Sequence, residues 1–171
     1  MAKPRESGFS LIELLIVVAV ILVILAIAVP RLLHARIRAN EASATASIRA
    51  IQSAEALYSS SYPAVGYSAR LVNLGKNGTA CESVSSANAC LIDDMLATGS
   101  KNGYTFDLTG DGATPDSAYN IHAVPISNGY TGQCSFSSDE SGSIHAQSNT
   151  GRGALVEPGG GFSGCELGAS M

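Results

Sequence analysis

The sequence predicts an α+β protein in which a long N-terminal α-helix, the spine, packs on a small antiparallel β-sheet head. Three observations predict this fold. Residues 9–29 form a nearly unbroken apolar run, residues 31–58 repeat apolar side chains at helical spacing, and the polar remainder contains short alternating segments between turn residues. We therefore divide the chain into a leader (1–8), an apolar half-helix (9–30), an amphipathic half-helix (31–58) and a head (59–171).

Charge is distributed unevenly along the chain. Residues 1–58 carry six Lys or Arg against four Asp or Glu, whereas residues 59–171 carry four against ten. Because binding to phosphate backbones needs clustered basic side chains, the acidic head is not expected to bind nucleic acid. Its acidity is typical of a soluble surface.

The leader is short and basic. Lys3 and Arg5 precede Gly8, which stands immediately before the apolar run. An ordinary secretory signal is cleaved after its apolar region, whereas a cut at Gly8 would leave the apolar segment in the mature protein.

The apolar run has 21 residues, enough as a helix to cross a bilayer core of ~30 Å. Its carboxylate, Glu13, would cost about 2.5 to 3.5 kcal/mol if it were ionised in lipid. Glu13 therefore lies near the interface, is protonated, or is paired with a cation. Basic residues stand on both sides of the run, so their distribution does not fix the orientation of the span.

The order Gly8-Phe9-Ser10-Leu11-Ile12-Glu13, followed by the apolar run and Pro30, resembles the prepilin cleavage and methylation motif of type IV pilins and type II secretion pseudopilins. This resemblance implies that a prepilin peptidase cuts between Gly8 and Phe9 and methylates the new amino group of Phe9. It also implies that Glu13 pairs with that amino group on a neighbouring copy. Such a pair is favoured because an unpaired buried charge is penalised more than a paired one.

The resemblance further implies a structural subunit of a type IV pilus-like filament, with a type II secretion pseudopilin as the alternative. The expected partners are other copies of the chain, the prepilin peptidase, the inner-membrane assembly machinery and, before assembly, the lipid bilayer. The head would be exported while the span stays in the inner membrane, and assembly would give an extracellular pilus or a periplasmic pseudopilus. No enzyme motif of the Gly-x-Ser-x-Gly, His-Glu-x-x-His or phosphate-loop type is present. A role in adhesion, motility or DNA uptake is left open.

The second half of the helix begins after Pro30, which is expected to kink or locally melt the helix and, by the resemblance, to matter in assembly. One face is expected to be apolar. Its members are Leu33, Ile37, Ala44, Ile48, Ile51 and Tyr58. The other face is expected to be polar. Its members are Arg36, Arg38, Glu41, Arg49, Gln52 and Glu55.

The head is expected to begin with an irregular stretch and one short helix over 90–97, followed by an antiparallel meander. The predicted strands are 104–108, 119–124, 133–137 and 143–146. Turn residues separate them at 109–112, 128–129 and 138–142. The Gly-rich end, 151–171, is expected to be irregular.

All four cysteines lie in the head, which favours disulfides formed in an oxidising compartment. Their spacing matches no zinc template. Four cysteines permit three pairings. We expect Cys81–Cys90 and Cys134–Cys165, because each pair joins neighbours in sequence and closes a short loop; a bridge near the C-terminus also resembles that of pilus subunits.

Two weaker signals concern ligands. Asp107, Thr109, Asp111 and Gly112 match the first half of a calcium loop, but Ala118 stands where such a loop needs a Glu. A hairpin turn is therefore favoured over calcium, and no cofactor is expected. His122 and His145 are expected to be structural, and a glycosylation-type sequon at 77–79 is a common chance match.

Overall fold

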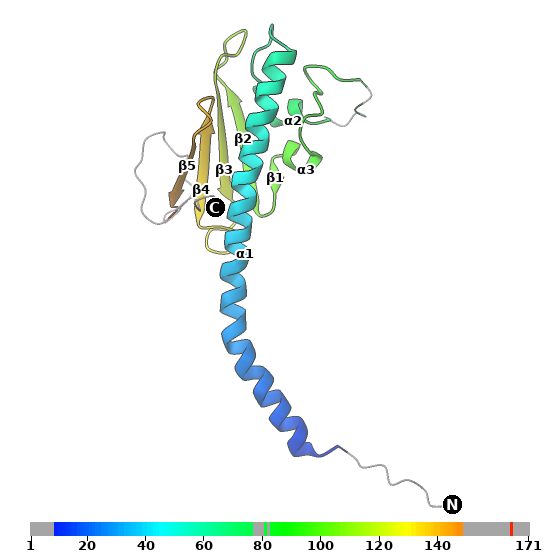
Figure 1. The fold of residues 1–171 in the computed structure, drawn as a ribbon, viewed down its shortest axis with the longest axis vertical. Helices are drawn as coiled ribbons and strands as arrows, with labels where there is room; N and C mark the ends of the chain where they lie inside the picture. Colours follow the sequence, from blue (N-terminus) through cyan, green and yellow to red (C-terminus); the bar gives the residue numbers. More distant parts are fainter. Residues whose placement is uncertain (1–8, 77–80, 82, 149–164, 166–171) are drawn as a thin grey trace, which may run out of the picture. The chain divides into compact units, whose positions relative to one another are not determined.

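The structure is a computed structural model that describes residues 9–76, 81, 83–148 and 165. Three helices precede or flank a five-stranded sheet (Figure 1). The helices are α1 (Leu11–Ser61), α2 (Leu71–Leu74) and α3 (Asp94–Ala97). The strands are β1 (Ser100–Lys101), β2 (Tyr104–Gly110), β3 (Tyr119–Pro125), β4 (Cys134–Asp139) and β5 (Ile144–Ser148). The chain divides into two compact units, residues 1–36 and 37–171, and this division falls within α1. The α+β fold is confirmed.

Helix α1 is 51 residues long and continues through Pro30. The expected local melting at Pro30 is therefore absent, because a proline removes one backbone donor while the other helical hydrogen bonds remain available. The helix also extends three residues past the expected end at Tyr58 and stops at Ser61, two residues before Pro63. Loss of helical order at Pro30 on assembly stays a prediction.

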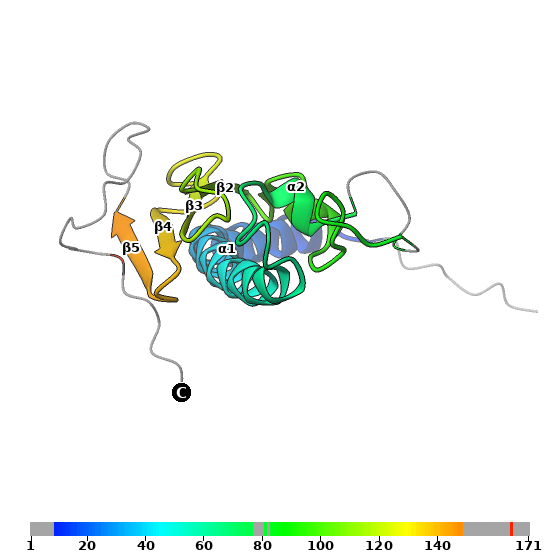
Figure 2. The same ribbon diagram turned by 90° about the horizontal axis from the view of Figure 1, so that it is seen from above.

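The sheet is an antiparallel meander in which the strands follow one another in chain order, β1 to β5. Each of the four expected strands is present, and their bounds differ from the predicted ones by no more than two residues. Successive strands pair because their connections are short, as the turn residues indicated. The C-terminal half of α1 lies against one face of this sheet (Figure 2).

The core lies between α1 and that face of the sheet. In β2, the buried side chains alternate with exposed ones, as the period of a half-buried strand requires. One cross-strand row runs Phe106, Ala123, Phe136 and Ala146, so that large and small side chains alternate across four strands. All four are buried together with five side chains of α1. Those five are Ala44, Ile48, Ile51, Ala54 and Tyr58.

Two short elements were not predicted, and one predicted helix is shorter than expected. The expected helix over 90–97 begins only at Asp94. It cannot begin at Cys90, because Cys90 has a positive φ of 53°. Asp93 instead caps the helix by accepting a hydrogen bond from the Leu96 N–H at 3.0 Å. The elements α2 and β1, with four and two residues, are too short to show a detectable period.

The two faces of α1 are distributed almost as expected in the part of the helix that belongs to the second compact unit, from Ile37 onward. Ile37, Ala44, Ile48, Ile51 and Tyr58 are buried, but Leu33 is 39% exposed. Leu33 lies in the first compact unit, outside the head. The larger departure is Glu55. It was expected on the polar face, yet it is 0% exposed.

Candidate assembly site

The start of α1 carries the residues that the sequence motif singles out. Ser10 precedes the first helical residue, Leu11, and Glu13 is the third residue of the helix. The Glu13 carboxylate accepts a hydrogen bond from the Ser10 backbone N–H at 3.1 Å. This is the Glu half of a capping box, which satisfies a backbone donor that the helix itself leaves without a partner. The Ser-x-x-Glu spacing could have indicated this bond from sequence.

The apolar half of α1 is lined with exposed hydrophobic side chains. They are the Leu, Ile and Val residues from Leu11 to Val29, and Phe9, two residues before the helix begins, is 77% exposed. α1 is the one helix among residues 9–76 and 83–148 that is long and apolar enough to cross a membrane. An apolar surface of this extent indicates a binding surface for lipid or for other apolar helices.

Some predicted site residues lie outside the part of the chain that the structure describes. Gly8, on the N-terminal side of the expected cut, is one of them, as are the sequon at 77–79 and the Gly-rich end at 151–164 and 166–171. The cleavage and methylation at Phe9 stay predictions.

The head contains two disulfides. Cys81 bonds to Cys90 and Cys134 bonds to Cys165, with Cα–Cα distances of 5.9 Å in both cases. These are the pairs expected from their order in the chain. The first bridge fastens the irregular stretch before α3, and the second attaches Cys165 to the first residue of β4.

The calcium candidates occupy the end of β2 and the connection to β3. Asp107 and Thr109 are exposed residues of β2. Asp111 accepts hydrogen bonds from the Ala113 N–H at 2.9 Å and from the Ser117 hydroxyl at 2.6 Å. These bonds, with that of the Ser117 hydroxyl foremost, lower the pKa of the Asp111 carboxyl. Its carboxylate therefore organises the turn, and calcium binding stays a proposal without support from this geometry.

The two histidines lie in one cross-strand row on the sheet face opposite the core. The row runs Asp107, His122, Ser137 and His145 across β2 to β5. The sequence alone did not show this alignment, because it depends on the register of three hairpins. Among the described residues, no group of three or more His, Cys, Asp or Glu side chains is arranged to hold a metal ion.

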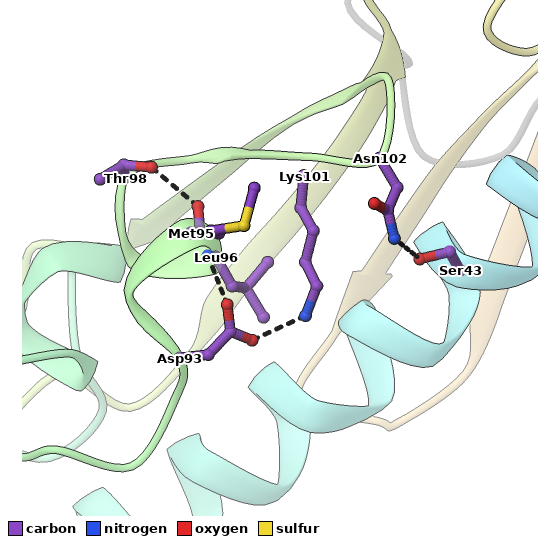
Figure 3. A network of polar contacts seen from close by, with 7 residues as sticks. All are labelled: Ser43, Asp93, Met95, Leu96, Thr98, Lys101 and Asn102. Atoms are coloured by element: carbon purple, nitrogen blue, oxygen red, sulfur yellow. Dashed lines mark hydrogen bonds and ion pairs between the residues drawn. The ribbon is translucent and has the colours of Figure 1, made fainter.

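Polar contacts join the head to α1 near the start of the second unit. The Asn102 amide, at a residue with φ of 47°, donates to the Ser43 hydroxyl at 2.7 Å (Figure 3). In the same view, Lys101 contacts the Asp93 carboxylate at 2.7 Å. The Lys101 hydrogen bond is the main cause that lowers the pKa of Asp93. Asp93 thus caps α3 and fixes β1 with a single carboxylate.

Two further bonds fasten the loop between β3 and β4 to α1. Asn40 donates to the Thr131 carbonyl at 2.9 Å, and the Gln133 N–H donates to the Glu41 carboxylate at 2.9 Å. Polar residues on α1 therefore orient the head on the helix, in addition to the apolar core.

Comparison with known proteins gives matches in the N-terminal region and beyond. The family model described as "Prokaryotic N-terminal methylation motif" matches residues 3–29. The "Type IV wide pilus major component PilA4" of Thermus thermophilus is 38% identical over 97 residues, which cover 52% of this chain and 72% of that protein. No solved structure gives a significant match.

Two other relatives match over a shorter segment. The "Type IV narrow pilus major component PilA5" of Thermus thermophilus is 45% identical over 53 residues, covering 31% of this chain and 46% of that protein. The "Type IV major pilin protein PilA" of Myxococcus xanthus is 40% identical over 53 residues, covering 31% of this chain and 24% of that protein. The matched segments thus span less than half of these two relatives. The match to the wide pilus component covers more than two thirds of that protein, and the chain therefore belongs to the type IV pilin family.

Proposed function

We propose that the chain is a structural subunit of a type IV pilus-like filament, anchored in the inner membrane by α1 before assembly. One observation carries this proposal: the methylation motif, which matches residues 3–29, includes the start of a helix of 51 residues whose first half exposes apolar side chains. Such a surface is stable in lipid or against copies of itself. The same helix therefore anchors the subunit in the membrane before assembly and packs against other copies in the filament.

The processing step is part of the proposal. A prepilin peptidase hydrolyses the peptide bond between Gly8 and Phe9, which frees the amino group of Phe9. It then transfers to that nitrogen a methyl group from a methyl donor, and the nitrogen loses one proton. The new cation lies four residues from Glu13 in sequence. In a filament, the Glu13 carboxylate pairs with the Phe9 amino group of a neighbouring copy, so that neither charge is buried alone.

The relatives support a pilus in preference to a secretion pseudopilus, since two are named as major components of a type IV pilus and the third as a type IV major pilin. We therefore infer that the head is exported and that the assembled filament is extracellular. The two disulfides of the head are consistent with export to an oxidising compartment.

Mass spectrometry of sheared filaments tests the processing step. The subunit should begin at methylated Phe9. A filament subunit that begins at Met1, or beyond Pro30, would contradict it.

Variants of Glu13 test the assembly step and separate it from helix capping. Glu13→Gln keeps an oxygen that accepts the Ser10 N–H bond but removes the charge, whereas Glu13→Leu removes both. If charge pairing drives assembly, both variants should insert in the membrane and both should lose filaments severely, because a buried cation without its partner costs about 3 to 5 kcal/mol. Normal filament yield from Glu13→Gln would refute pairing and leave only a capping role.

A further inference from the structure

Glu55 is a buried carboxyl group without a cationic partner. It lies on α1 and is 0% exposed. One carboxyl oxygen accepts a hydrogen bond from the Ser68 backbone N–H at 2.8 Å. The other oxygen, Oε1, is buried and finds no hydrogen-bond partner among the described residues. Neither of the ion pairs formed within the described residues includes Glu55.

The groups around Glu55 are acidic or phenolic. Asp116, from the connection between β2 and β3, acts on it electrostatically, and the charge of Glu55 in turn contributes to the raised pKa values of Tyr58 of α1 and Tyr119 of β3, whose largest cause is burial. Asp116 also has one buried oxygen, Oδ1, that no group in the described part of the chain contacts by a hydrogen bond. Burial raises the pKa of Glu55; together with the opposing effect of the Ser68 N–H and the smaller raising effect of the Asp116 charge, it brings this pKa to about 7. An ionised Glu55 would therefore lack both water and a counter-charge.

The partner of Glu55 belongs to a segment that follows α1 and crosses to the sheet. The Tyr67 N–H donates to the Asp116 carbonyl at 3.0 Å, and the Asp116 N–H donates to the Val65 carbonyl at 2.8 Å. The Tyr67 ring also contacts the Tyr119 ring, with centroids 4.9 Å apart. Residues 62–68, here called the crossing segment, are thus held to the β2–β3 connection by Asp116, to β3 by Tyr119 and to α1 by Glu55.

We propose that the folded head holds Glu55 in its protonated form and that loss of this proton releases the crossing segment from α1. A neutral carboxyl group can keep the hydrogen bond from the Ser68 N–H while its second oxygen stays out of contact with water, because the desolvation free energy of a neutral group is modest. A carboxylate in the same place must regain water, and the route to water is movement of the segment that covers it. The head thereby contains a pH-sensitive latch, separate from the assembly role of Glu13.

The sign of the effect follows from linkage. The pKa of Glu55 is higher in the folded head than its ordinary value of 4.5, so the folded state holds the proton more tightly. The stabilisation is fully present below about pH 4.5 and is lost as the pH rises through about 7. Across this window the ratio of latched to released head should fall on the order of 100-fold.

Carboxyl ¹³C NMR of the full chain in detergent micelles, with labelled Glu, measures the titration directly. The Glu55 resonance is the one missing in Glu55→Gln. In the wild-type chain it should titrate near pH 7. A midpoint near pH 4.5 overturns the proposal, and this readout needs no destabilised variant because the titration is that of the wild-type chain.

Hydrogen exchange tests the release of the segment. Protection of the Tyr67 and Ser68 amides, corrected for the intrinsic pH dependence of exchange, should fall between pH 5 and pH 8 in the wild type. It should stay level in Glu55→Gln, which carries no ionisable proton. Glu41→Gln is the matched control, because Glu41 also lies on α1 and accepts a hydrogen bond from a backbone N–H outside the helix, that of Gln133, but is partly exposed; it should behave as the wild type.

A further experiment with calcium tests whether a divalent cation, and not a proton, neutralises the Glu55 carboxylate. Calcium chloride added at pH 8 should leave the Ser68 amide unprotected. Restored protection would overturn the proposal, since a divalent cation would then be the partner of Glu55. Equal protection of the wild type at pH 5 and pH 8 would overturn it as well.

Discussion

Gly66 provides a sharp test of how the crossing segment is packed. It has a φ of +83°, a conformation that a side chain makes costly. A Cβ atom at Gly66 would lie 2.1 Å from the Asp116 carbonyl oxygen and 2.7 Å from the Asp116 nitrogen. These are backbone atoms of the bridge that Gly66 forms with Asp116, so no flexible side chain can move aside.

The cost of Gly66→Ala has two parts. The left-handed backbone costs a non-Gly residue about 1 to 2 kcal/mol. Relief of the clash requires the segment to move from Asp116, which breaks the two backbone hydrogen bonds that join Tyr67 and Val65 to Asp116, at about 1 kcal/mol each. The free energy of unfolding should therefore fall by about 3 to 4 kcal/mol.

Gly129 is the matched control. It has a φ of +80°, and nothing lies within 4 Å of an added Cβ atom. Gly129→Ala should therefore lose only the backbone part, about 1 to 2 kcal/mol. Guanidinium unfolding of the full chain in detergent, followed by near-UV circular dichroism of the tyrosines, measures both variants. Equal losses for the two alanine variants would refute the argument that the Asp116 backbone excludes a side chain at Gly66.

The remaining predictions concern the bridges and the core. Replacing Cys134 and Cys165 by Ala opens a loop of 31 residues and should lower the free energy of unfolding by about 3 to 4 kcal/mol, whereas replacing Cys81 and Cys90 opens one of 9 residues and should cost about 2 to 3 kcal/mol. The same unfolding assay measures both, and a larger loss from the shorter bridge would contradict the loop-entropy explanation. Phe136→Ala should cost about 3 to 5 kcal/mol, because its ring is buried in the cross-strand row of the core; a loss below about 1 kcal/mol would mean that the core refills the space.

Most of the sheet could be predicted from sequence because each strand carries its own signal. Tyr104, Phe106 and Leu108 alternate with polar residues, and the turn residues on either side mark where the strand ends. The order of the strands then follows from the short connections. By contrast, α2 and β1 contain too few residues for a period, and their positions depend on tertiary contacts such as the pair between Lys101 and Asp93.

The burial of Glu55 could not be predicted, because it depends on a segment distant from the helix face. On a helical wheel, Glu55 falls beside Gln52, which donates to Ser138 and Gly142 and is only partly buried. Glu55 is buried because the crossing segment places the Ser68 amide over it. Periodicity describes the two sides of a helix, whereas the covering of one polar residue depends on a loop whose course it does not specify.

The position of Glu13 at the third residue of α1 explains how one carboxylate can serve two states of the chain. While the subunit is single, its carboxylate is near the helix N-terminus, where the macrodipole and the Ser10 N–H both favour negative charge. A charge so placed needs no second chain, which lowers its cost at a membrane interface. After the cut that we propose, the amino group of Phe9 becomes a stronger partner than a neutral amide, because charge-assisted bonds are roughly twice as strong. Exchange of the Glu13 bond to its own helix N-terminus for a pair with a neighbour's Phe9 amino group would then favour the filament over the single subunit. Glu13→Gln isolates the contribution of the charged pair, because it keeps the capping bond and loses the charge.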